Sequence, residues 1–175
     1  MTESDKPTGV SRRTVTTAMA WAVPAVALAA PVAAFATSGP KPGLSLGAAC
    51  KAPGGSLKCQ GVDFKFGYGV PVTVTNSGPL DIWIYSLAIT SQIPADPALT
   101  PTAAVPLPVK VPANGGSVTF LMGGTSTNSS NWSGSLTLEL AWGHTQTHAG
   151  DTDHDSNPIV ATVSWAETPP GCVCP

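Results

Sequence analysis

The chain has 175 residues, including 18 glycines and 18 prolines, and only 10% of its residues are charged. Soluble domains average about 25% charged residues, so this composition excludes a coiled coil, a helical bundle and a charged disordered tail. The formal net charge of −2 excludes the electrostatic attraction on which nucleic-acid binding depends, so we expect no nucleic-acid partner.

Residues 1–36 are typical of an export signal. A polar start ends in Arg12 and Arg13, and residues 14–36 carry no charge. That apolar stretch closes with small residues at Ala34 and Ala36. A basic start, an apolar centre and an A-x-A site predict a helical signal peptide that is cleaved after Ala36.

The string Ser11–Val15, which contains both arginines, resembles a twin-arginine signal, the kind that exports folded proteins. The alternative is an N-terminal membrane anchor that is never cleaved. Pro24 and Pro31 make the apolar stretch a poor spanning helix. We therefore expect a secreted or cell-surface protein with no membrane span after cleavage.

The rest of the chain divides into a linker and one domain. Residues 37–49 are rich in Gly, Pro and Ser and are expected to form a linker. Residues 50–175 are expected to form a single domain. Its strands follow in chain order.

The clearest strand pattern covers residues 62–76. Apolar side chains occupy every second position: Val62, Phe64, Phe66, Tyr68, Val70, Val72 and Val74. This period of two predicts one long strand with a buried face and a wet face. Gly67, Gly69 and Pro71 indicate a bulge or an edge position. A turn at 76–79 and a second strand at 80–90 follow.

The next segment, residues 91–108, contains five prolines. This density excludes a helix or a central strand and predicts a long loop or an irregular edge. A short strand at 109–112 and a turn at 113–116 come next. Strands are then expected at 118–122, 135–144 and 159–165, separated by polar loops.

Several short strands and no convincing amphipathic helix favour an all-β, antiparallel sandwich of about seven strands. We expect nine residues in or near its core: Phe64, Phe66, Val72, Val74, Ile82, Leu138, Leu140, Val160 and Val163.

The segments 72–78 (VTVTNSG) and 111–120 (VPANGGSVTF) carry a resemblance. They resemble the strand-and-turn motifs of immunoglobulin-like domains on bacterial surfaces. The chain is also similar to small actinobacterial proteins exported by the twin-arginine route, most of them uncharacterised. The resemblance covers roughly residues 60–166 and implies an immunoglobulin-like fold without naming a function. The proline-rich insert departs from the pattern.

Four cysteines, Cys50, Cys59, Cys172 and Cys174, follow the expected signal. An even number in an exported chain favours disulfides, of which three pairings exist. A four-thiolate zinc site is the alternative, although the usual C-x2-C pairs are absent. A hairpin at 50–59 would pair its own two cysteines, but Cys172–Cys174 would then close a strained ring. We favour the pairings that join the two ends of the domain.

Residues 142–155 hold all three histidines and the alternating acids Asp151, Asp153 and Asp155. Alternating carboxylates are typical of calcium loops. The EF-hand pattern fails, because Ser156 and Thr162 stand where Gly and Glu are required. A second possibility is zinc.

The candidate zinc ligands are His144 and His148, together with His154 or Asp151. The simpler interpretation of this segment, which we favour, is a solvated loop between the last two strands.

Trp132 lies in the polar segment 128–134. An aromatic residue in such a loop is a candidate for stacking on a sugar ring. The alternative, which we favour, is a side chain that folds back on the domain.

Catalytic motifs are absent from the sequence. It has no G-x-S-x-G elbow and no phosphate-binding loop between a strand and a helix. Only Glu139 and Glu167 remain as glutamates after the signal, and they define no acid–base pair. We expect no catalytic residue and no cofactor.

The sequence thus predicts an exported, non-catalytic domain with a binding or structural role at the cell envelope or outside the cell. The sequence does not identify a partner, and a cell-wall polysaccharide and another surface protein are the candidates. A carbohydrate-binding module and a metal-dependent adhesion domain, using calcium or zinc, are the alternatives.

Overall fold

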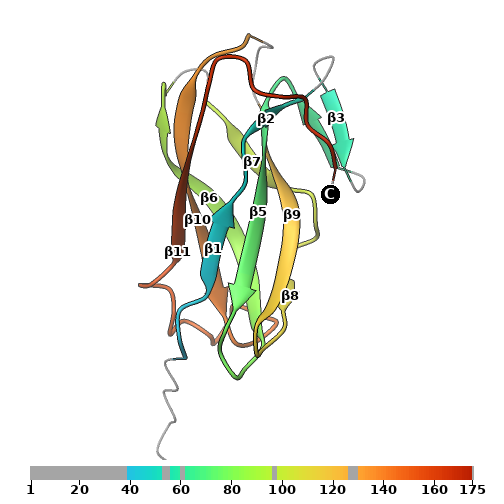
Figure 1. Ribbon diagram of the computed structural model, residues 1–175. Coiled ribbons are helices and arrows are strands. Elements are labelled where there is room, and N and C mark those ends of the chain that lie inside the picture. Colours follow the sequence, from blue (N-terminus) through green and yellow to red (C-terminus); the bar gives the residue numbers. More distant parts are fainter. Residues whose placement is uncertain (1–38, 53–55, 60–61, 96–97, 126–129, 175) are drawn as a thin grey trace, which may run out of the picture. The chain divides into compact units, whose positions relative to one another are not determined.

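A computed structural model describes residues 39–52, 56–59, 62–95, 98–125 and 130–174 (Figure 1). The expected signal peptide, including Arg12, Arg13, Ala34 and Ala36, lies outside these residues. The described part is all-β, and every pair of its eleven strands is antiparallel. It contains no helix that could cross a membrane.

The first sheet is centred on β5 (Tyr68–Asn76) and β9 (Gly116–Thr125). β1 (Gly43–Leu46) and β2 (Cys50–Lys51) lie one after the other along the outer side of β5. β7 (Thr100–Ala103) lies beside β9, which gives the order β1-β5-β9-β7.

The second sheet has the order β11-β10-β6-β8. Its two central strands are β6 (Ile82–Ile93) and β10 (Gly134–Gly143), and β8 (Val109–Val111) and β11 (Ile159–Trp165) form its edges. The pairing of β10 with β6 shifts register twice, whereas its pairing with β11 is continuous.

The main core lies between the two sheets. Because successive side chains of a strand point to opposite faces, each long strand contributes alternate residues to it. β5 supplies Val70, Val72 and Val74, and β10 supplies Leu136, Leu138, Leu140 and Trp142. The remaining large members are Tyr68, Ile82, Ile84, Leu99, Phe120, Met122, Ile159 and Trp165.

A smaller core lies under the two-stranded sheet formed by β3 (Ser56–Cys59) and β4 (Val62–Lys65). Here Phe64 packs against β9, where the chain has a glycine. A Cβ atom at Gly123 would lie 1.7 Å from a ring carbon of Phe64, so only glycine leaves room for the ring.

Two disulfides, Cys50–Cys172 and Cys59–Cys174, join this end of the domain to the C-terminal tail. Hydrogen bonds from the Lys51 amide to Pro170 and from the Cys172 amide to Lys51 align the tail with β2. Figure 1 shows the tail passing over the end of the domain that holds β2 and β3. The expected end-to-end pairing is confirmed, and the zinc-thiolate alternative is wrong.

Several expectations about the first half of the chain are wrong. Residues 37–49 are not only a linker, because β1 pairs with β5 from Gly43 to Leu46. The strand count of the described residues exceeds the expected seven, whereas the irregular edge expected in the proline-rich segment is confirmed by the edge strand β7. The segment 50–59 is not a hairpin, since β2 pairs with β5 and β3 with β4.

The long strand expected at 62–76 is broken at Phe66. This residue adopts a left-handed φ of 53°, and its side chain is 41% exposed instead of buried. The break coincides with a close contact between two backbone segments of the domain. A Cβ atom at Gly67 would lie 1.6 Å from the carbonyl oxygen of Gly124, so the backbones of β4–β5 and β9 meet directly.

Val160 is also misplaced by the sequence prediction. Ile159 and Trp165 are buried and Val163 packs against the core, so the odd-numbered residues of β11 face inward. Val160 is therefore on the outer face, where it is 49% exposed.

Val72→Ala and Val160→Ala remove the same atoms from a buried and an exposed site. We expect Val72→Ala to lower the free energy of unfolding by about 2 kcal/mol or more, because it leaves a cavity between the sheets. Val160→Ala should cost under about 1 kcal/mol, the scale of the change in strand propensity. Denaturant unfolding with the disulfides intact measures both, and equal losses would contradict the described core.

Candidate functional site

The loop between β10 and β11, residues 144–158, is organised around Asp151. This side chain is only 8% exposed. Its Oδ2 atom accepts hydrogen bonds from the Tyr85 hydroxyl (2.7 Å), the His144 amide (2.6 Å) and the Thr145 amide (2.8 Å). The Thr145 hydroxyl donates to the same oxygen at 3.1 Å. Gly143 makes this approach possible, because a Cβ atom there would lie 2.5 Å from Oδ2.

These hydrogen bonds decide the charge of Asp151. Burial opposes ionisation, but the donors from Tyr85, Thr145 and His144 outweigh it and hold the pKa of Asp151 below its usual value. The carboxylate is therefore charged at neutral pH. Its function in this arrangement is to satisfy the backbone of the loop.

Two of the three histidines of the loop, His144 and His154, contact each other and Trp142. The ring of His154 lies flat on Trp142, with ring centroids 3.8 Å apart. His144 meets both rings edge-on, at 5.7 Å from Trp142 and 5.1 Å from His154. Burial, and then the neighbouring His144, lower the pKa of His154. The Nε2 atom of His144 is buried without a hydrogen-bond partner.

The other three residues considered for metal binding are arranged differently. His148 Nε2 lies 2.7 Å from Asp155 Oδ1, and Asp153 is exposed. No group of three or more His, Cys, Asp or Glu within the described ranges is arranged to hold a metal ion. The geometry therefore gives the candidate calcium or zinc site no support there.

Trp132 lies at the opposite end of the domain, in a cluster with Tyr68 and Trp165. The three ring centroids are 4.8 to 5.1 Å apart. The Tyr68 hydroxyl accepts from the Trp132 amide (2.8 Å) and donates to the Trp132 carbonyl (3.1 Å), which also accepts from Trp165 Nε1 (2.9 Å). Trp132 thus folds back on the domain, as the favoured interpretation has it.

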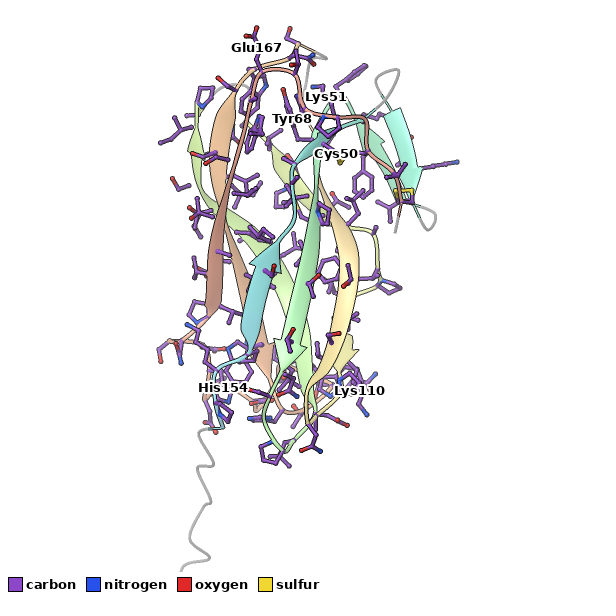
Figure 2. The ribbon with its side chains drawn as sticks, viewed as in Figure 1. Cys50, Lys51, Tyr68, Lys110, His154 and Glu167 are labelled. Carbon is purple, nitrogen blue, oxygen red and sulfur yellow. A yellow bond between two sulfur atoms is a disulfide. The ribbon has the colours of Figure 1, made fainter. Side chains whose placement is uncertain are left out.

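Lys51 covers this aromatic cluster. Its Nζ atom lies 4.2 Å above the centre of the Tyr68 ring and donates to the carbonyls of Phe66 (3.1 Å) and Ser130 (3.2 Å). Figure 2 shows Lys51 and Tyr68 at the end of the molecule opposite His154. Partial burial lowers the pKa of Lys51. Sequence reasoning missed this cluster because its members lie on four separate segments.

Comparison with known proteins returned no match. No family model, no curated protein and no solved structure matches this chain.

His154 makes the stability of the domain depend on pH. Since its pKa is lowered in the folded protein, the unfolded chain gains a proton first as the pH falls below about 6.5. The folded state should therefore lose stability from about pH 6.5 downward, until the pH passes the folded pKa. His154→Phe keeps a flat ring on Trp142 but cannot be protonated.

We expect His154→Phe to unfold at nearly the same temperature as the wild type at pH 8 and at a higher temperature below pH 6. Melting curves across this range give the measurement. Parallel pH profiles for the two proteins would contradict the assignment.

Proposed function

We propose that this protein is an exported, non-catalytic domain that acts by binding, or as a structural part, at the cell envelope or outside the cell. The pair of disulfides carries the proposal. Disulfides form and persist in oxidising compartments and are rare in the cytosol, and all four cysteines of the chain are paired. The signal-like residues 1–36 support the same location.

We further propose that the domain is an immunoglobulin-like sandwich, preceded by the helical signal peptide. That fold places strands A, B, E and D in one sheet and C, F and G in the other. Taken in chain order, β1, β5, β6, β7, β9, β10 and β11 fill the positions A to G, since the sheets read β1-β5-β9-β7 and β11-β10-β6. β8 then extends the second sheet, and β2, β3 and β4 are insertions.

The titratable side chains of the loops are engaged within the loops themselves, which supports a binding or structural role. Asp151 is engaged by the loop backbone, and His148 by Asp155. The two alternatives, a carbohydrate-binding module and a metal-dependent adhesion domain, have less support. Trp132 presses its ring against Tyr68 and Trp165 rather than outward, which weighs against sugar stacking.

Export should depend on the twin arginines. We expect Arg12→Lys together with Arg13→Lys to leave the precursor inside the cell with reduced cysteines, because the charge is kept and only the twin-arginine identity is lost. Lys6→Arg, another charge-preserving exchange in the polar start, is the matched control and should be exported normally. Cell fractionation is the readout, and normal secretion of the double variant would point to the general secretory route.

Binding should be independent of divalent metal. The protein is incubated with insoluble polysaccharides and with cell-wall material, with and without EDTA. We expect binding to at least one surface and an unchanged melting temperature in EDTA. A melting temperature that falls in EDTA would favour the metal-dependent alternative. Turnover of a substrate that one side-chain change abolishes would overturn the non-catalytic proposal.

A further inference from the structure

The two main sheets have four edges, and three of them carry features that discourage pairing with another chain. β7 is four residues long and contains Pro101, and β8 is three residues long and contains Lys110. The edge formed by β1 and β2 is broken between Leu46 and Cys50. Short edge strands, prolines and lysines are the usual protection of a sheet edge.

The fourth edge, β11, has none of these features. It runs for seven residues, Ile159–Trp165, without a proline or a charged side chain, and its pairing with β10 has no bulge. Within the described residues it pairs only with β10. β1 lies beside it (Figure 1) but forms its ladder with β5. The outer edge of β11 therefore presents unpaired backbone groups that can accept another strand.

We propose that β11 pairs antiparallel with β11 of a second copy of this chain, so that two four-stranded sheets join into one of eight strands. The absence of charge on the strand favours a second copy as the partner. Pairing across a twofold axis sets the central residue of a strand against its own copy and doubles every other charge on the strand, so a charged strand would repel its copy. A seven-residue strand without charges can pair with its own copy without such repulsion.

The twofold axis would pass through Thr162, the central residue of β11. Thr162 then faces its own copy, while Val160 faces Ser164 and Ala161 faces Val163. Hydroxyl pairs of this kind already occur in the molecule. Thr137 and Thr162 are 2.9 Å apart on this sheet, and Thr73 and Thr119 are 3.0 Å apart on the other. In the dimer, the Thr137–Thr162 pair of one copy would continue into the Thr162–Thr137 pair of the other, as one row of hydroxyls across the joined sheet.

The nearest charge on the same face does not oppose this arrangement. Glu139 lies on β10 opposite Val160. Strand geometry places the two copies of Glu139 three strand spacings and four residues apart, roughly 20 Å. This separation exceeds the screening length of about 8 Å at physiological salt. The edge is short, about 23 Å by its rise per residue, so the dimer should be weak and concentration-dependent.

Sedimentation equilibrium of the full chain, with its disulfides intact, tests the proposal. We expect the mass of the wild type to rise from one copy towards two with concentration. Thr162→Lys places a charge against itself at the axis and should weaken dimerisation at least tenfold. Thr73→Lys makes the same exchange in the threonine pair of the other sheet and should dimerise like the wild type.

Hydrogen exchange gives a readout that locates the contact. Amides in β11 should become better protected as the concentration rises, while those in β7 should not change. Circular dichroism establishes that Thr162→Lys is folded. A wild type that stays monomeric at millimolar concentration would overturn the proposal. So would dimerisation unaffected by Thr162→Lys, or growth into assemblies larger than two. The inference goes beyond the proposed function, since it concerns the pairing of the chain with itself in any compartment.

Discussion

Two disulfides join the beginning of the domain to its end. They hold in place the parts of the domain that the hydrophobic core stabilises least. The main core is shared by both sheets, whereas the β3–β4 hairpin and the tail share only a small cluster around Phe64 and Leu121. The disulfides span 122 and 115 residues. Closing a loop of about 100 residues stabilises a fold by about 4.7 kcal/mol in the chain-entropy description. The second link adds less, because the first already brings its cysteines near each other.

At both ends of the domain a side chain holds a polar loop through hydrogen bonds to the loop backbone. At one end the Asp151 carboxylate accepts hydrogen bonds from the amides of His144 and Thr145. At the other end Tyr68 exchanges hydrogen bonds with the backbone of Trp132. At the first end the loop is fixed by its own Asp151, which Tyr85 of β6 holds in turn, and at the second end it is fixed by Tyr68 of β5. The residues that looked most functional are therefore held by the fold.

The sequence was most informative where a run of apolar and β-branched residues has no interruption. β11 occupies the predicted residues 159–165, which contain no glycine and no proline. Gly67, Gly69 and Pro71 indicated a bulge or an edge position, but the break at Phe66 coincides with the approach of Gly67 to Gly124, residues far apart in the chain. The exposure of Val160 likewise depends on which face of β11 meets the other sheet. Trp132 could be placed only as one of two alternatives, because its partners lie on other segments.

The central claim is that an oxidising compartment closes this domain by joining its first strands to its last residues. Mass-spectrometric mapping of unreduced peptides, on protein recovered from outside the cell, tests it most directly. The account predicts one peptide pair that links Cys50 to Cys172, a second that links Cys59 to Cys174, and no free thiol. A Cys50–Cys59 link, which would release the tail from the domain, or four free thiols would contradict it.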